Sequence, residues 1–202
     1  MCSCAGSAPV LRPVVGILLA GGRGRRFDPS GQRNKLLQLL PQGTGVAEQS
    51  AITLASAVDK VWAVVPSDSD GLAATLRQAH IPTVPCPQCD LGMAESLKAG
   101  VLAAQASAPV QGWVVALADM PFVQPETVRL LVQALRLGAR VAVPVFEGKR
   151  GNPVAFSYRC LPDLLALQGD TGARSMLGAS DVQRIVVNDP GILRDIDQPS
   201  DL

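Results

Sequence analysis

Histidine, aromatic residues and an excess of charge of either sign are nearly absent from this sequence. Its 202 residues include one histidine and 3% aromatic residues, and 18 Lys and Arg residues balance 17 Asp and Glu residues. A formal net charge of +1 offers no basic surface for a nucleic acid, which proteins bind through many cationic side chains. The histidine, His80, lies in no serine or cysteine pattern, which argues against a hydrolytic triad and favours an exposed turn residue.

Long hydrophobic runs are absent as well. The longest apolar stretch near the start runs from Val14 to Ala20, well short of the ~20 residues that cross a bilayer. Residues 1–12 have no basic segment before an apolar one, so they predict a loose leader rather than a signal peptide. The length suits one domain, which we place at residues 13–202 of a cytoplasmic protein without a membrane partner.

The five cysteines are an odd number without secretory context, which favours a reducing cytoplasm over a disulfide framework. Cys86 and Cys89 have the Cys-x-x-Cys spacing of metal and redox sites. A zinc site needs about four ligands, however, and the chain has one histidine to add. A redox pair should open a helix, whereas Asp-Leu-Gly follows Cys89. We therefore predict oxidisable loop cysteines without a role in catalysis or metal binding.

Hydrophobic residues make up 48% of the chain and form short apolar runs that alternate with helical patterns. Unbroken apolar runs are typical of strands buried on both faces of a parallel sheet. The pattern predicts a three-layer α/β fold with a doubly wound, mostly parallel sheet, whose ligands bind beyond the carboxyl ends of the strands. The expected strands are Val14–Ala20, Val61–Val65, Trp113–Ala118, Val141–Val145, Pro153–Ser157 and Val182–Val187, and the expected helices lie near Val46–Ala57, Gly71–Ala79, Met93–Ala106 and Pro125–Leu137.

The segment Gly21-Gly22-Arg23-Gly24-Arg25-Arg26 follows the first expected strand. Its glycines allow consecutive backbone N–H groups to point at one anion, and its arginines can pair with phosphate oxygens. No Gly-Lys-Ser or Gly-Lys-Thr follows, which excludes a Walker A loop, and Phe27 stands at the third glycine position of the dinucleotide fingerprint. A phosphate cradle is the more economical interpretation, and a surface loop with chance basic residues is the alternative. Lys35 lies within reach of this loop.

Asp119 comes directly after Trp113–Ala118, which should be a central strand. A carboxylate there is costly to desolvate unless it is paired or binds a cation. With one histidine in the chain, a catalytic metal must rely on oxygen ligands, which favours Mg²⁺. Asp195 and Asp197 would present two further carboxylates on one face of an extended segment, although cap or turn chemistry explains that pair equally well.

Six motifs follow one another along nearly the whole chain, from Val14 to Leu202. They are Leu19-Ala20-Gly21-Gly22 with Arg26 and Lys35, Gly92-Met93-Ala94-Glu95-Ser96-Leu97, Leu117-Ala118-Asp119-Met120-Pro121, Arg150-Gly151-Asn152-Pro153, Gly169-Asp170-Thr171-Gly172-Ala173-Arg174, and Asp195-Ile196-Asp197-Gln198-Pro199. Together they resemble the motifs of the nucleotidyltransferases that finish molybdenum cofactor. The Gly92–Leu97 loop in particular resembles the cytidylyltransferase branch more than the guanylyltransferase branch.

This resemblance implies a Rossmann-like nucleotidyltransferase fold. It also implies a reaction in which the terminal phosphate of molybdopterin attacks the α-phosphorus of CTP and pyrophosphate leaves. Such a transfer needs positioned anions and neutralised charge rather than covalent chemistry from the protein. The implied partners are a nucleoside triphosphate and molybdopterin, with a molybdoenzyme or its insertion chaperone as a further partner.

The resemblance also implies which residues form the site. Lys35 and Arg26 would be the catalytic residues, because they would oppose the charge of the triphosphate. Asp119 would hold Mg²⁺, with Asp197 as a second ligand. The nucleotide-binding residues would be Leu19, Ala20, Gly21, Gly22, Arg23, Gly24, Ser96 and Asp119, with Ser96 on the side of the base or ribose.

Three features depart from the cytidylyltransferase pattern. Gly22 stands where that branch usually has alanine, and the sequence Gly21-Gly22 is typical of the guanylyltransferase branch. Thr171 stands where lysine is common, and residues 28–34 lengthen the path to Lys35. The alternatives are therefore a GTP-dependent guanylyltransferase and a catalytically silent, cofactor-carrying module for a molybdoenzyme. A sugar-1-phosphate nucleotidyltransferase would typically be longer.

Overall fold

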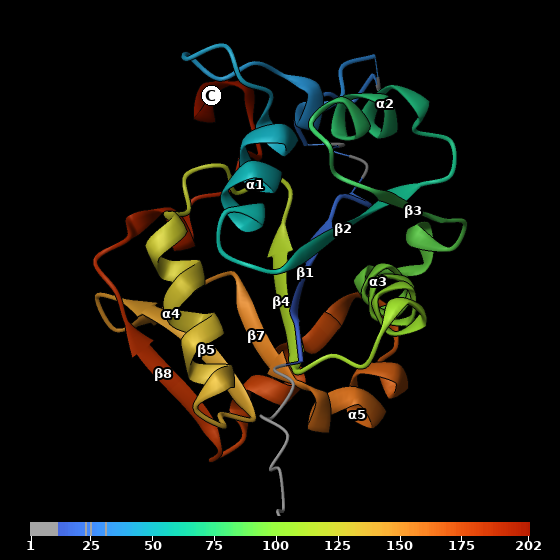
Figure 1. The fold of residues 1–202 in the computed structure, drawn as a ribbon. Helices are drawn as coiled ribbons and strands as arrows, with labels where there is room; N and C mark the ends of the chain where they lie inside the picture. Colours follow the sequence, from blue (N-terminus) through green and yellow to red (C-terminus); the bar gives the residue numbers. More distant parts are fainter. Residues whose placement is uncertain (1–11, 23, 25, 31) are drawn as a thin grey trace, which may run out of the picture.

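Eight strands form one sheet with helices on both of its faces (Figure 1). The computed structural model describes residues 12–22, 24, 26–30 and 32–202, so the expected leader lies almost entirely outside the described residues. The strands are β1 (Val14–Leu19), β2 (Lys60–Pro66), β3 (Thr83–Cys86), β4 (Gly112–Leu117), β5 (Val141–Phe146), β6 (Lys149–Arg150), β7 (Val154–Ser157) and β8 (Val182–Val186).

The sheet is mostly parallel, as predicted. Its strands follow the order β3-β2-β1-β4-β7-β5-β6, and β8 pairs with β5. β1 is parallel to both β2 and β4, and β8 is parallel to β5. β7 runs antiparallel between β4 and β5, and β6 turns back antiparallel on β5. All six residues of β1 are buried because strands cover both of its edges and helices cover both of its faces.

The helices divide between the two faces of the sheet. They are α1 (Val46–Ala55), α2 (Asp70–Gln78), α3 (Met93–Ser107), α4 (Pro125–Arg136) and α5 (Leu161–Ala166). Val14 and Leu18 of β1 belong to the apolar cluster formed with α1, α2 and α4. Val15 and Ile17 belong to the opposite cluster, formed with α3 and α5. This alternation confirms the three-layer, doubly wound architecture. No helix in the described ranges is long and apolar enough to cross a bilayer.

Each expected strand and helix is present within a few residues of its predicted bounds, but β3, β6 and α5 were not expected. β3 has only four residues, one of them Pro85, and its place beside β2 alone explains why a proline is tolerated. His80 lies in the turn after α2 with a φ of +60° and is exposed, as predicted.

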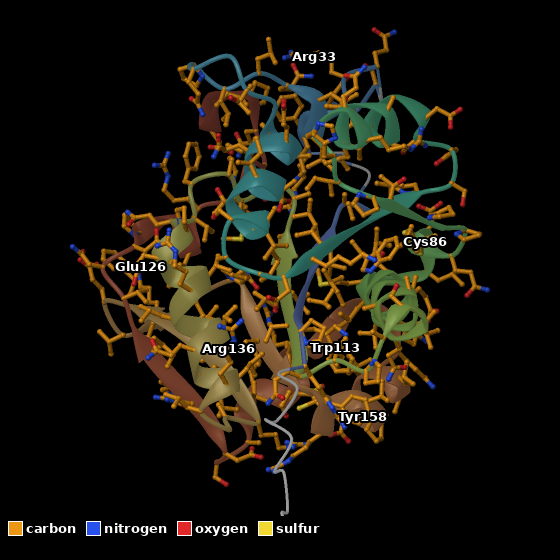
Figure 2. The ribbon with its side chains drawn as sticks, viewed as in Figure 1. Arg33, Cys86, Trp113, Glu126, Arg136 and Tyr158 are labelled. Carbon is orange, nitrogen blue, oxygen red and sulfur yellow. The ribbon has the colours of Figure 1, made fainter. Side chains whose placement is uncertain are left out.

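The prediction of loop cysteines was wrong for Cys86 and Cys89. Cys86 ends β3, and Cys89 begins a short 3₁₀ helix, η2 (Cys89–Leu91); both side chains are buried. Figure 2 places Cys86 beside α3. Both thiols therefore belong to the core of the α3 layer.

Candidate active site at the carboxyl ends of β1 and β4

The glycine turn follows β1 without a break in the hydrogen bonding of the sheet. Ala20 N–H donates to the carbonyl of Val64 in β2 at 2.9 Å, and Phe27 N–H donates to the carbonyl of Gly24 at 2.9 Å. Gly24 has a φ of +60°, in the left-handed region that glycine adopts without the steric cost of a Cβ. The turn is thus anchored by the sheet at one end and closed on itself at the other.

The two glycines that begin the turn have different surroundings. A Cβ on Gly21 would lie 2.7 Å from Ser96 Oγ and 2.9 Å from Cys89 Sγ, which is too close for either contact. A Cβ on Gly22 would meet no atom of the described residues within 4 Å. Gly21 is therefore packed against the protein, whereas Gly22 borders open space in which an anion can approach the backbone. Arg23 lies outside the described residues.

Lys35 begins a short 3₁₀ helix, η1 (Lys35–Leu37), and its side chain is 8% exposed. Its ammonium donates to Asp119 Oδ2 at 2.7 Å, to the carbonyl of Ile196 at 2.9 Å and to Asp197 Oδ1 at 3.3 Å. Three acceptors match the three donors of an ammonium group, so this buried charge is fully paired.

Asp119 and the segment around Asp197 lie side by side because Ile196 N–H donates to the carbonyl of Asp119 at 2.8 Å. Asp119, Asp195 and Asp197 each present a carboxylate oxygen, and these oxygens lie within 4.8 Å of one another. Oxygen donors at such spacing fit a hard divalent cation such as Mg²⁺. Asp195 joins the cluster although the sequence predicts it only as one of a carboxylate pair, and the alternating Asp195-Ile196-Asp197 pattern is the signal for it.

Two further contacts orient Asp197. The guanidinium of Arg26, whose side chain is 80% exposed, lies 2.5 Å from Asp197 Oδ2. Asp201 Oδ2 accepts hydrogen bonds from the backbone N–H groups of Gln198 and Asp197, and these bonds lower the pKa of the Asp201 carboxyl. Asp197 is thus paired with both Arg26 and Lys35, and Asp119 is paired with Lys35.

The structure brings Arg26, Lys35, Asp119 and Asp197 into this one cluster, and Gly24 borders it because a Cβ there would lie 3.3 Å from Lys35 Cγ. Leu19 and Ala20 are buried, so only their backbone groups could meet a nucleotide.

Ser96 lies on the other side of the turn, within the first turns of α3. The expectation of a loop at Gly92–Leu97 was wrong, because Gly92 caps α3 and Met93–Leu97 is helical. It is buried, and its hydroxyl donates to Cys89 Sγ at 3.1 Å rather than facing open space. Burial, together with a hydrogen bond to Cys86, raises the pKa of the Cys89 thiol to about 12. This thiol is therefore protonated and neutral under physiological conditions. A direct contact between Ser96 and a nucleotide stays a prediction.

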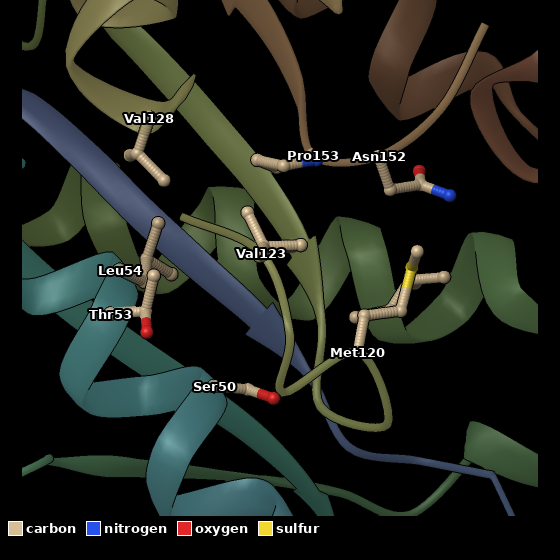
Figure 3. A pocket seen from close by; sticks show the side chains of 10 residues that line it. Ser50, Thr53, Leu54, Met120, Val123, Val128, Asn152 and Pro153 are labelled. Atoms are coloured by element: carbon tan, nitrogen blue, oxygen red, sulfur yellow. The ribbon is translucent and has the colours of Figure 1, made fainter. Parts of the chain in front are cut away.

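A small pocket of about 10 Å³ lies between α1, α4 and the loop after β4 (Figure 3). Ser50, Leu54, Met120 and Val128 are among the residues that line it. A cavity of this size holds at most about one water molecule, so it cannot be a nucleotide site. The open surface beside Gly22 is the better candidate.

This chain is similar to several known proteins in sequence and in fold. The sequence profile of the MobA-like NTP transferase domain matches residues 16–185. The purine catabolism protein PucB of Bacillus subtilis is 30% identical over 199 residues, which cover 93% of each chain. The manganese complex of Rv0371c from Mycobacterium tuberculosis has a TM-score of 0.75 at 22% identity, over 94% of this chain and 95% of that chain.

A third relative is the molybdopterin-guanine dinucleotide biosynthesis protein A of Archaeoglobus fulgidus, with a TM-score of 0.66 at 18% identity over 93% of this chain and 94% of that chain. The two structural neighbours support the fold, whereas the profile match and the relationship to PucB define the family. With its glycine turn and charged cluster at the strand ends, this chain belongs to the family of MobA-like NTP transferase domains.

Proposed function

We propose that this protein joins the cytidine monophosphate moiety of CTP to the phosphate of molybdopterin and releases pyrophosphate. The observation that carries the proposal is the convergence of the glycine turn with Lys35, Asp119 and Asp197 beyond the carboxyl ends of β1 and β4. Membership of the NTP transferase family supports the nucleotide donor. The name of the Archaeoglobus neighbour supports a molybdopterin acceptor.

In this reaction an oxygen of the acceptor phosphate forms a bond to the α-phosphorus, and the bond from that phosphorus to the oxygen bridging to the β-phosphate breaks. Backbone N–H groups of the Gly21–Gly24 turn would bind the triphosphate. Arg26 is exposed and can reach the leaving pyrophosphate from its position beside Asp197. Lys35 would place a fixed positive charge beneath the phosphates, because its stem lies against Gly24.

Asp119, Asp195 and Asp197 would hold the divalent metal ion. The ion, when bound, neutralises charge on the phosphate oxygens. The manganese complex of Rv0371c supports a divalent ion in this fold, and the oxygen donors lead us to propose Mg²⁺. Lys35 keeps two of the three carboxylates close together by pairing with Asp119 and Asp197.

CTP is the proposed donor because the Gly92–Leu97 segment, at the start of α3, resembles the cytidylyltransferase branch. Gly22 borders open space, and a permissive position does not by itself reject the smaller base. Base choice instead needs hydrogen-bonding groups or clashes directed at the wrong base. The guanylyltransferase alternative is favoured by Gly22 and by the guanine dinucleotide named in the Archaeoglobus neighbour. A silent carrier module is disfavoured because Lys35 and Asp119 are present and paired.

The test is pyrophosphate release from CTP and from GTP, each with and without molybdopterin. We expect release from CTP that depends on the acceptor. At limiting Mg²⁺, Asp119→Asn should lower turnover by ~10²–10³, the usual effect of losing one preorganised electrostatic contact. Asp163→Asn is the matched control, because Asp163 is an exposed carboxylate bound to Arg140 away from the site. Near-normal turnover of Asp119→Asn would refute the metal assignment.

We also propose a cytoplasmic location and a single domain at residues 13–202. Cys86, Cys89 and Cys160 are free thiols, as in a reducing compartment. The family match at residues 16–185 falls within the proposed domain. Thiol blocking in intact cells followed by fractionation would test the location.

A further inference from the structure

We propose that Cys89 is a positioning residue of the nucleotide site: with Ser96, it holds the Gly21 turn at a fixed distance from the amino end of α3. The inference rests on the proposed function, since the Gly21 turn is the part of the chain that would bind the triphosphate. Cys89 itself would not touch the nucleotide. It would act through the backbone of Gly21.

The close approach of Gly21 to two side chains is the first observation. A Cβ on Gly21 would lie 2.7 Å from Ser96 Oγ, 2.9 Å from Cys89 Sγ and 3.3 Å from Cys89 Cβ. Gly21 therefore has these two side chains as its direct support on the side of α3. A glycine is required there for packing, and not because of a left-handed backbone.

The second observation is the linkage between the two supporting side chains. Ser96 Oγ donates to Cys89 Sγ at 3.1 Å, and both residues are buried. Cys89 in turn contacts the thiol of Cys86 at the end of β3. Buried side chains thus connect the turn after β1 to β3, η2 and α3, which follow one another directly in the sequence. Because packed interiors transmit small displacements, a change at Cys89 should move Gly21.

The chemistry of Cys89 fits a support and does not fit a reactive group. A buried thiol whose pKa is raised to about 12 is protonated and is a poor nucleophile. A neutral thiol also adds no negative charge next to a bound triphosphate. Its soft, polarisable sulfur fills the space between Gly21 and Ser96.

The position of Cys89 also links the turn to the start of α3. Gly92 N–H donates to the carbonyl of Cys89 at 3.3 Å, and Gly92 has a φ of +127° where α3 begins. The same residue, Cys89, therefore contacts the phosphate-side turn through its side chain and the N-cap of α3, Gly92, through its backbone. We infer that it sets the separation of the two.

Cys89→Ala and Cys86→Ala form a matched pair of variants. Both remove a buried thiol from the same cluster, but Cys89 contacts Gly21 and Cys86 is not among the nearest neighbours of that glycine. The measurement is the Kd of a non-hydrolysable CTP analogue with Mg²⁺, in the absence of acceptor, together with Tm. We expect similar losses of Tm. The Kd should rise about tenfold for Cys89→Ala, and it should stay within about twofold for Cys86→Ala.

Cys89→Ser tests the same contact by a conservative change, because a hydroxyl keeps the partner of Ser96 with a shorter reach. Its Kd should lie between those of the wild type and Cys89→Ala. Gly21→Ala, alone and combined with Cys89→Ala, completes a double-mutant cycle that should be clearly non-additive. The cycle is measured by the Kd of the same CTP analogue in every variant. A general loss of stability, seen as a fall in Tm, would not by itself produce the non-additive change in Kd.

The possible results separate the two proposals. If the wild type binds the analogue and Cys89→Ala binds it as well as Cys86→Ala does, the positioning role is wrong while the proposed function stands. Additive effects of Gly21→Ala and Cys89→Ala would also contradict it. If the wild type binds neither CTP nor GTP analogues, both proposals fail. A loss of affinity for the CTP analogue in Cys89→Ala but not in Cys86→Ala, with partial recovery in Cys89→Ser, supports the positioning role of Cys89.

Discussion

Lys35 is buried although a lysine in front of an apolar run is usually a solvated flank. Burying a lone ammonium is costly, and the cost is offset only when its donors are paired. Lys35 meets that condition through Asp119, Asp197 and the carbonyl of Ile196. The same three contacts give the residue two effects on the site. It holds Asp119 and Asp197 close together. Its positive charge also opposes the binding of a metal ion to the same carboxylates.

We predict that Lys35→Met tightens the binding of Mn²⁺ in the absence of nucleotide by about tenfold, because a competing charge is removed from the carboxylates. Turnover with CTP and molybdopterin should nevertheless fall by ~10²–10³. Electron paramagnetic resonance of free Mn²⁺ gives the affinity. Lys60→Met is the control, since Lys60 contacts Trp62 at the opposite end of β2. Weaker Mn²⁺ binding would mean that Lys35 mainly organises the carboxylates.

Cys89 predicts a specific dependence of stability on alkaline pH. Its pKa is raised from 9.0 in the unfolded chain to about 12 by burial, so the folded protein keeps a proton that the unfolded chain loses. The stabilisation is complete below the unfolded pKa and is lost as pH rises from about 9 toward 12. Urea unfolding between about pH 8 and 10 should show a falling free energy of unfolding. The slope should be shallower in Cys89→Ala, and equal slopes would contradict the assignment.

At the scale of elements, the start of α4 depends on a residue far along the chain. The side chain of Gln124, which precedes α4, makes no capping hydrogen bond. Asp189 instead accepts from Gln124 N–H at 2.9 Å, from Thr127 Oγ1 at 2.6 Å and from Gly191 N–H at 2.9 Å. Its side chain thus fastens the segment that leads to the acidic cluster onto α4. Asp189 is 2% exposed.

We predict that Asp189→Ala lowers the free energy of unfolding by about 3 kcal/mol, because it leaves buried donors without an acceptor. Asp189→Asn should cost less, since one amide oxygen remains to accept. Equilibrium urea unfolding provides the values. Asp181→Ala, the same change at an exposed carboxylate, should stay within about 0.5 kcal/mol of the wild type. A loss below about 1 kcal/mol for Asp189→Ala would contradict this role.

At the scale of the whole molecule, the fold was predictable where hydrophobic pattern alone decides it. The apolar runs that become β1, β2 and β4 indicate buried parallel strands, because few other structures bury most residues of a short segment, and all six residues of β1 and most of β2 and β4 are buried. The antiparallel direction of β7 was not predictable, since Val154–Ser157 is equally apolar in either direction. Strand direction depends on the path of the chain between elements.

The candidate site was predictable only as a set of residues. The motifs around Gly21, Lys35, Asp119 and Asp197 identified members of the cluster, but not their mutual pairing. Lys35 and Asp119 are 84 positions apart, and Lys35 and Ile196 are 161 apart. Which of these groups neutralises which is decided by tertiary contacts that no local pattern encodes. The support of Gly21 by Cys89 and Ser96 was hidden for the same reason.

Gly22 offers a change that the fold should tolerate without adjustment. A Cβ at this position meets no atom within 4 Å in the part of the chain that the structure describes, so Gly22→Ala should leave Tm within about 1 °C of the wild type. We predict that it sharpens the preference for CTP by lowering kcat/KM for GTP. Steady-state kinetics with both nucleotides give the two ratios. An unchanged ratio would show that Gly22 does not contribute to base choice.

The central claim is that this chain transfers a cytidylyl group to molybdopterin, and competition between the two nucleotides tests it most directly. CTP and GTP, each labelled at the α-phosphate, are supplied together with molybdopterin and Mg²⁺, and the label recovered in the dinucleotide product is counted. The account predicts acceptor-dependent product that contains mainly cytidine, with pyrophosphate formed in equal amount. Product that contains mainly guanosine would contradict the proposed donor. Label that never enters molybdopterin would contradict the claim itself.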